Sequence, residues 1–171
     1  AKTPKPLISI VKIQIMNQSL TIMVSPPSTV NATSRMEPAV RQEGGYTEFF
    51  RWGCDNYGQL GHGNDRGLKQ RRLDVPKSLS FEVRISSIAC GTSFACFMTQ
   101  SNQVFAFGDN SFGQLGINDR AVPFSYSPLL VSAFEKLSIH LRSIHCGGMH
   151  AAALTQSGEV VMWGRNQEGQ C

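Results

Sequence analysis

The stretch ISSIACGTSFACFMTQSNQVFAFG, residues 85–108, recurs without a gap as LRSIHCGGMHAAALTQSGEVVMWG, residues 141–164. Cys90 matches Cys146, and a Thr-Gln-Ser triplet begins nine residues later in both copies. The offset is 56 residues, and a fixed period of this length indicates a repeated supersecondary unit. The fold must therefore be read from the repeat.

A second motif repeats in phase with the first. The sequence WGCDNYGQLG at 52–61 returns as FGDNSFGQLG at 107–116, with five of ten positions identical, and begins again as WGRNQEGQC at 163–171. Tight turns and close backbone approach favour glycine, so we expect the repeated glycines and aromatic residues to have structural roles. These repeat positions are Trp52, Gly53, Gly58, Gly61, Gly91, Phe107, Gly108, Gly113, Gly116, Gly147, Trp163 and Gly164.

The repeated unit contains short apolar runs, at 94–98 and 104–107 in one copy and at 151–154 and 160–163 in the next. Runs of this length predict strands buried on both faces rather than helices. Asn102 in one copy faces a glycine in the other, which indicates a tight hairpin turn with positive φ. All-β units of about 55 residues with glycines at fixed places are typical of β-propeller blades, and the intervening sections should be surface connections with further short strands.

The Cys-Gly pair, the Thr-Gln-Ser turn, the Trp-Gly or Phe-Gly pair and GQLG together resemble the repeat of the regulator of chromosome condensation family. The resemblance implies a ring of seven blades, which would need about 385 residues. We therefore expect the 171 residues to form an incomplete arc, as a fragment, a truncated product or one half of an assembly. Gly45 stands too close to Trp52 to match the later units, so the first hairpin should be missing or degenerate. The predicted division is an N-terminal extension, 1–45, irregular or with one strand, followed by partial repeats, 46–171.

The N-terminal segment has basic and hydroxyl-bearing residues but no acid through residue 35. That composition could belong to an organellar transit peptide, but the isoleucines between 8 and 15 fall mostly at two-residue spacing, which favours a strand. Lys12 and several amides interrupt the apolar run at 7–24, so we predict no membrane span. Five cysteines without metal-type spacing favour a reducing, intracellular location, cytoplasmic or nuclear, with organellar targeting left open.

Chemistry-bearing motifs have simpler structural explanations. GQLGHG at 58–63 lacks the Gly-Lys-Ser/Thr ending of a phosphate-binding loop, and it repeats with the units. His145, Cys146 and His150 could suggest a metal site, but an alanine and a phenylalanine replace the two histidines one unit earlier. Cys90 and Cys146 occupy equivalent positions, so we expect small buried side chains and no disulfide between them. We therefore predict no catalytic residue, no metal and no cofactor.

The net charge of +4 permits an acidic partner but does not require nucleic acid. The distinctive surface feature is a basic cluster after the first GQLG, which could contact an acidic protein, nucleic acid or chromatin, or anionic lipid, or could be a solvated loop. We assign partner binding to Arg66, Lys69, Arg71, Arg72 and Lys77.

Three functions follow from the resemblance. The first is a non-catalytic protein-interaction module, or scaffold, with a protein partner. The alternative is a guanine-nucleotide exchange factor, or part of one, for a Ran-like small GTPase, although no exchange residue can be assigned. An ultraviolet-B photoreceptor of the related plant type would need clustered tryptophans, whereas here Phe107 stands between Trp52 and Trp163 in the repeat series.

Overall fold

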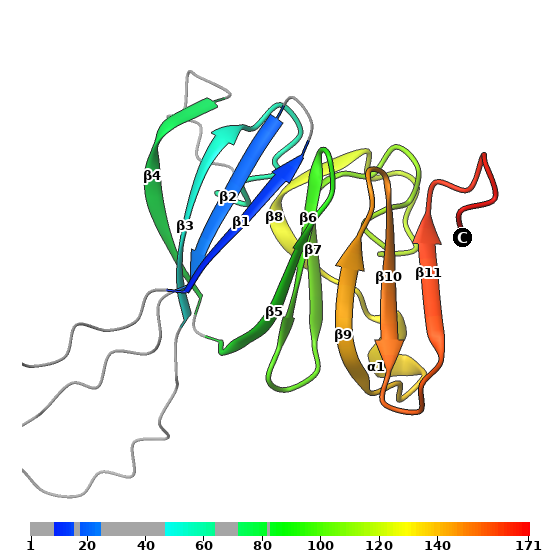
Figure 1. Cartoon of the computed structure of the whole chain (residues 1–171). Coiled ribbons are helices and arrows are strands. Elements are labelled where there is room, and N and C mark those ends of the chain that lie inside the picture. Colours follow the sequence, from blue (N-terminus) through cyan, green and yellow to red (C-terminus); the bar gives the residue numbers. More distant parts are fainter. Residues whose placement is uncertain (1–8, 16–17, 25–46, 64–71, 82) are drawn as a thin grey trace, which may run out of the picture.

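A computed structural model describes residues 9–15, 18–24, 47–63, 72–81 and 83–171. The described strands form three antiparallel sheets that stand side by side in an open arc (Figure 1). The first sheet contains β1 (Ser9–Ile15), β2 (Gln18–Val24), β3 (Thr47–Cys54) and β4 (Arg72–Phe81); the second contains β5 (Ile85–Cys90), β6 (Phe94–Thr99), β7 (Val104–Asp109) and β8 (Phe124–Leu130); and the third contains β9 (Leu141–Cys146), β10 (His150–Thr155) and β11 (Val160–Gly164). This is the all-β arc of propeller blades that the repeat predicts.

The two predicted hairpins are confirmed. β6 pairs with β7 from Phe94↔Gly108 onward, and β10 pairs with β11 in the equivalent register from His150↔Gly164. Their turns carry the positive φ that was predicted, 66° at Asn102 and 90° at Gly158. β8 is the further strand expected in the surface connection, and a one-turn helix that was not predicted, α1 (Ala133–Lys136), follows it.

Two apolar clusters hold the sheets together, and β6 belongs to both. Phe94 and Cys96 face the cluster between the second and third sheets, whereas Ala95 and Phe97 face the cluster between the first and second. Because side chains alternate across a strand, every side chain of β6 is buried against one neighbouring sheet or the other. This confirms the prediction from its continuous apolar run.

The prediction that an apolar run forms a strand buried on both faces is wrong for β11. Val160 is 63 % exposed and Met162 is 39 % exposed, because within the described chain no further strand or sheet covers this side of the third sheet. An apolar run indicates which residues can be buried. Burial itself requires a neighbour.

The N-terminal segment also differs from what we expected. It contributes two strands rather than an irregular segment or one strand, and β2 pairs with β3 through Met23↔Phe50 and Val24↔Phe49. In the first sheet, the hairpin β1–β2 therefore takes the place that β5–β6 has in the second sheet. Its sequence alternates apolar and polar residues and lacks the Cys-Gly motif. The boundary at residue 45 lies outside the described residues and stays a prediction.

Candidate interaction surface

The GQLG turn after β7 is fixed by its own side chains. Asn110 Oδ1 accepts a hydrogen bond from Leu115 N at 3.2 Å, and Gln114 Oε1 accepts one from Phe112 N at 2.8 Å. Gln114 Nε2 in turn donates to Asp109 Oδ2 at 2.7 Å. Gln114 and Leu115 are both buried, so the repeated Gln and Leu anchor the turn from inside and leave the preceding aromatic residue at the surface.

Two of these side-chain bonds have equivalents in the first copy, where Cys54 stands in the place of Asp109. Leu60 N donates to Asp55 Oδ1 at 2.9 Å, and Tyr57 N donates to Gln59 Oε1 at 2.9 Å. Gly61 N also donates to Gly58 O at 2.9 Å, and φ is 85° at Gly58 and 61° at Gly61. Phosphate-binding loops present unpaired backbone N–H groups to their ligand. Here these N–H groups are used within the turn, as expected of a structural motif.

Each turn also receives the aromatic residue of the next sheet. Trp163 Nε1 donates to Gln114 O at 2.9 Å, and the Trp163 ring packs edge-on against Phe134 with centroids 5.6 Å apart. An ideal Cβ on Gly116 would lie 2.8 Å from Trp163 Nε1, and one on Gly61 would lie equally close to the Phe107 ring. Glycine is therefore needed at this place for packing between sheets as well as for φ.

Aromatic and basic side chains gather on the outside of these turns. Tyr57 is 45 % exposed and Phe112, its equivalent, is 38 % exposed. The guanidinium carbon of Arg165 lies 5.5 Å from the centre of the Phe112 ring, a cation–π geometry, and Arg165 also forms an ion pair with Glu168. This set, together with Arg120, we call the turn surface.

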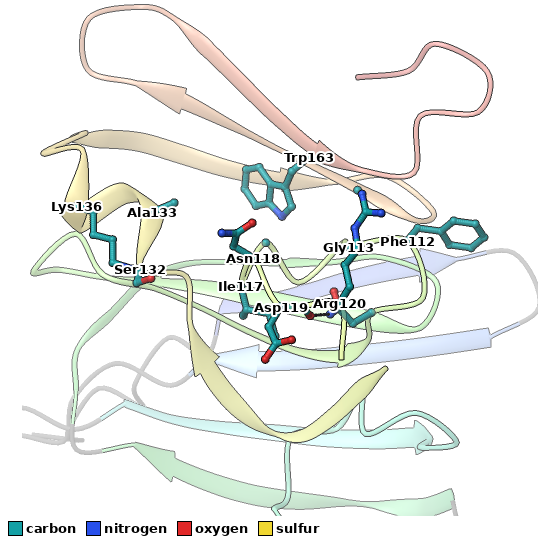
Figure 2. Close-up of a pocket in the computed structure, with 13 residues that line it drawn as sticks. Phe112, Gly113, Ile117, Asn118, Asp119, Arg120, Ser132, Ala133, Lys136 and Trp163 are labelled. Carbon is teal, nitrogen blue, oxygen red and sulfur yellow. Dashed lines mark hydrogen bonds between the residues drawn. The ribbon is translucent and has the colours of Figure 1, made fainter. Parts of the chain in front are cut away.

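Two adjoining grooves border the turn surface between the second and third sheets. One has a volume of about 450 Å³ and the other about 470 Å³. Figure 2 shows Trp163 on one wall of the first groove, with the loop that carries Asn118 and Arg120 opposite and Lys136 of α1 at the far end. Basic side chains, Arg120, Lys136 and Arg165, outnumber the one acidic residue, Asp119, among the lining residues.

A cluster of ionisable side chains on β3 and the turn that follows it is not repeated. His62 Nδ1 lies 2.9 Å from Asp55 Oδ2, and the His62 ring is 5.7 Å from that of Tyr126 on β8. Arg51 is buried and donates from Nη1 to Leu60 O at 2.7 Å. Burial lowers the pKa of Arg51, and the Asp55 carboxylate opposes that shift.

The predicted basic cluster is only partly described by the structure. Arg66, Lys69 and Arg71 lie outside the described residues, as does the side chain of Lys77. Arg72 is exposed at the start of β4 and pairs in register with Cys54 of β3, whereas Lys77 pairs with Arg51. Partner binding by these five residues remains a prediction.

The histidines considered for a metal site are separated by their strands. His145 is exposed on β9 and its Nε2 lies 3.0 Å from Ser143 Oγ, whereas the ring of His150 lies over Gly147. Among the residues that the structure describes, no group of three His, Cys, Asp or Glu side chains could hold a metal ion.

The cysteines contain a contact that the repeat does not predict. All five thiols are free, yet Cys96 Sγ lies 3.3 Å from Cys146 Sγ. The hydrogen bond with Cys96 and burial both raise the pKa of the Cys146 thiol, and burial raises that of Cys90. Sequence reasoning compared equivalent positions only, so it missed Cys96, which meets Cys146 because β6 packs against β9 of the next sheet.

Sequence reasoning also missed the turn surface. Tyr57 and Phe112 stand two residues before the repeated glutamine, and an aromatic residue among turn-forming polar residues was the available signal. Arg120 and Arg165 gave no such signal, because only the fold brings them beside the aromatic rings.

Three antiparallel sheets with glycine turns and aromatic residues between them define an arc of β-propeller blades, and comparison with known sequences identifies the family. The regulator of chromosome condensation (RCC1) repeat matches residues 48–98 and 101–154. A second description of that repeat matches residues 85–114 and 142–170. The chain belongs to the RCC1 repeat family.

Individual relatives share these repeats in different settings. The chain is 34% identical over 122 residues to the ultraviolet-B receptor UVR8 of Arabidopsis thaliana, covering 71% of this chain and 26% of the receptor. It is 31% identical over 126 residues to the human X-linked retinitis pigmentosa GTPase regulator, covering 74% of this chain and 12% of that protein. The crystal structure of human WBSCR16 is similar with a TM-score of 0.58 and 26% identity, covering 86% of this chain and 32% of that one.

The chain thus spans about a third or less of the length of these relatives. In the part of the chain that the structure describes, no helix is long and apolar enough to cross a membrane.

Proposed function

We propose that the chain is a non-catalytic protein-interaction module that binds its partner through the turn surface. The observation that carries the proposal is the exposure of Tyr57 and Phe112 at equivalent turns, with Arg165 stacked over the second ring. Tyrosine and arginine dominate the binding energy of protein interfaces, because they bring large contact area and hydrogen bonds together. The turns beneath them are held by buried side chains, so little order has to be gained on binding.

The state of the buried thiols supports a non-catalytic role. A cysteine nucleophile must ionise readily, since the thiolate is the reactive form. The raised pKa values of Cys90 and Cys146 keep both thiols protonated at neutral pH. The acidic side chains of the turns have structural roles as well, because Asp109 and Asp55 accept hydrogen bonds that hold the GQLG turns in place.

The test is comparative capture from a cell extract with quantitative mass spectrometry. We expect the double variant Tyr57→Ser, Phe112→Ser to lose at least about 80 % of a partner retained by the unchanged chain, because two anchor rings are removed. The matched control is Leu137→Ser, which removes an apolar side chain that is also exposed but lies next to α1. Equal loss in the control, or no loss in the double variant, would contradict the turn surface as the binding site.

The predicted basic cluster supplies a second element of this proposal. Reversing Arg71 and Arg72 to Glu should weaken an acidic partner, and the loss should shrink as salt is raised, because exposed charges are screened. The measurement is partner affinity at low and high salt. Unchanged affinity at low salt would remove the basic cluster from the interface.

Exchange on a small GTPase is the second candidate, and the name of one relative, a GTPase regulator, favours testing it. The experiment follows release of a fluorescent GDP analogue from a Ran-type GTPase with and without the chain. For a pure interaction module we expect the intrinsic release rate. An increase that is lost in the double variant of Tyr57 and Phe112 would replace the first proposal with the second.

A further inference from the structure

Two cysteines meet at the junction between the second and third sheets. Cys96 lies within β6 and is 1 % exposed, whereas Cys146 is the last residue of β9 and is partly exposed. Cys146 packs against the apolar cluster that contains Cys96, and the two Sγ atoms are 3.3 Å apart. Because the S–S bond of a disulfide is about 2.05 Å long, the sulfurs need to approach by only about 1.3 Å to form one.

The residues beside the two thiols are small. Ala89 and Ala106 pair with Cys96 from the two adjoining strands, and Ala151 pairs with Cys146. Residues directly opposite one another in a sheet place their side chains on the same face, so methyl groups border the thiol pair. A disulfide has no charge and no N–H or O–H group, and it can therefore be buried here without a polar partner.

The repeat does not require a cysteine at position 96. The offset of 56 residues places Ala152 in the third sheet where Cys96 stands in the second. Alanine is therefore accommodated at this place in a blade. The packing of the unit explains why the residue is small, but it does not explain why it carries a thiol next to that of Cys146.

We propose that Cys96 and Cys146 are a redox-sensitive pair, which a small disulfide such as oxidised glutathione converts into a reversible disulfide between the second and third sheets. The bond links positions that are 50 residues apart in the chain. Such a link restricts the unfolded chain and so stabilises the folded one. The proposal does not depend on the proposed interaction function.

The bond forms by two exchange steps. Cys146 Sγ, the more accessible sulfur, loses its proton and attacks one sulfur of oxidised glutathione, whose S–S bond breaks and releases one glutathione thiolate. Cys96 Sγ then loses its proton and attacks Cys146 Sγ in the mixed disulfide, which releases the second glutathione thiolate. The two released thiolates take up the two protons. Two protein thiols are thus oxidised, and one glutathione disulfide is reduced to two thiols.

The surroundings of the pair slow the first step and favour the second. The hydrogen bond with Cys96 and burial raise the pKa of Cys146, so its reactive thiolate is scarce at neutral pH. Once the mixed disulfide has formed, Cys96 is already beside the sulfur that it attacks, and a thiol held in place reacts faster than one in free solution. We therefore expect the bond to form slowly and to persist.

The first test identifies the bond in the unchanged full chain. The chain is incubated with oxidised glutathione, the remaining thiols are blocked with N-ethylmaleimide, and the products are digested with trypsin and chymotrypsin for mass spectrometry. Cleavage after Phe94 separates Cys90 from Cys96, so the two possible partners of Cys146 can be distinguished. We expect a Cys96–Cys146 peptide pair that dithiothreitol removes. A Cys90–Cys146 pair, or Cys146 carrying glutathione alone, would overturn the proposal.

The second test measures what the bond does to stability. Thermal unfolding of the oxidised chain should occur about 5 °C or more above that of the reduced chain, because the link removes freedom from the unfolded state. Cys96→Ala should abolish this difference. The matched control is Cys90→Ala, which alters a buried cysteine of the cluster between the first and second sheets and should keep the difference.

Comparing the oxidised and reduced forms of each variant cancels any loss of stability from the substitution itself. Should Cys96→Ala not fold, the peptide pair from the unchanged chain decides. An equal rise in Cys96→Ala would show that another modification stabilises the chain. A bond without any rise would show that it does not hold the two sheets together. Either outcome would contradict the proposal, and neither bears on capture through Tyr57 and Phe112.

Discussion

Gly113 and Gly116 lie in the same turn, and both have positive φ, 78° and 67°. Their surroundings differ, because only Gly116 faces the Trp163 indole. The pair therefore separates two reasons for glycine, the backbone conformation and the close approach of the next sheet. The identity of the residue alone cannot distinguish them.

Alanine at these positions should destabilise the fold by different amounts. Gly113→Ala should lower the free energy of unfolding by about 1–2 kcal/mol, the cost of a left-handed conformation for a residue with a Cβ. Gly116→Ala should lower it by a further 1–3 kcal/mol or so, because Trp163 must also move. Urea unfolding measures both, and equal losses would show that the Trp163 contact is not restrictive.

The cysteines should differ in their rates of alkylation. Cys171 is exposed, whereas burial shields Cys90 and raises its pKa, and the hydrogen bond with Cys96 together with burial raises the pKa of Cys146. A raised pKa means that the reactive thiolate is scarce at neutral pH and increases as pH rises. We expect iodoacetamide at pH 7.5 to modify Cys171 first and Cys90 and Cys146 last, as followed by peptide mass spectrometry. Early modification of Cys146 would contradict the described packing.

At the scale of elements, the β6–β7 turn joins two sheets, whereas the β10–β11 turn does not do so within the described chain. Asn102 Nδ2 donates to Ile139 O at 2.9 Å, and Asn102 Oδ1 accepts from Leu141 N at 2.7 Å. Asn102 therefore forms the β6–β7 turn, and its side chain also holds the start of β9 by two hydrogen bonds. Gly158, the equivalent residue, has the same sign of φ but no side chain to form such bonds.

Exchanging these two turn residues tests that difference. Asn102→Gly keeps a residue suited to positive φ but leaves Leu141 N and Ile139 O without their partner, so stability should fall by about 1–3 kcal/mol. The matched variant Gly158→Asn should change stability by less than about 1 kcal/mol. Thermal unfolding provides the measurement, and equal effects would remove the role of Asn102 between the sheets.

At the scale of the whole molecule, the sheets are not equally protected. The second sheet has a neighbour on each face, whereas the third has one, and β11 forms its outer edge in the described chain. Local opening requires less free energy where fewer apolar contacts must break. Stability should therefore decrease from β6 toward β11.

Hydrogen exchange followed by mass spectrometry should show this gradient. We expect the amides of β6 and β7 to exchange most slowly, and those of β11 at least about tenfold faster. Uniform protection across the second and third sheets would show that the arc opens as one cooperative unit.

Structural features could be predicted from the sequence when the residues that cause them lie close together in one repeat unit. The β6–β7 and β10–β11 hairpins were predictable, since apolar runs and a turn residue with positive φ are encoded within one unit. The β1–β2 hairpin was not, because β2 pairs with β3 across residues 25–46 and lacks the repeated Cys-Gly pair.

The surface was harder to predict than the sheets. The exposure of Met162 and the open space beside Gly113 depend on which segments lie next to them, and the repeat pattern describes each unit without its neighbours. The Cys96–Cys146 contact likewise joins positions that are not equivalent. Comparison of the repeats with one another therefore predicts the strands within each blade. It does not predict the contacts between blades or which residues remain exposed.

Similar units in one chain could dock in the wrong order, a common failure of repeat proteins. The residues Arg51, Asp55 and His62 have an alanine, an asparagine and an isoleucine at the equivalent positions in the next unit, and Arg51 and Asp55 are buried. A sheet that docked in place of the second would have to provide for the charges of Arg51 and Asp55 away from water, which costs free energy wherever the partners do not fit. The cluster thus distinguishes the first described sheet from the second, and burial of its charges disfavours an arrangement in which the two sheets are exchanged.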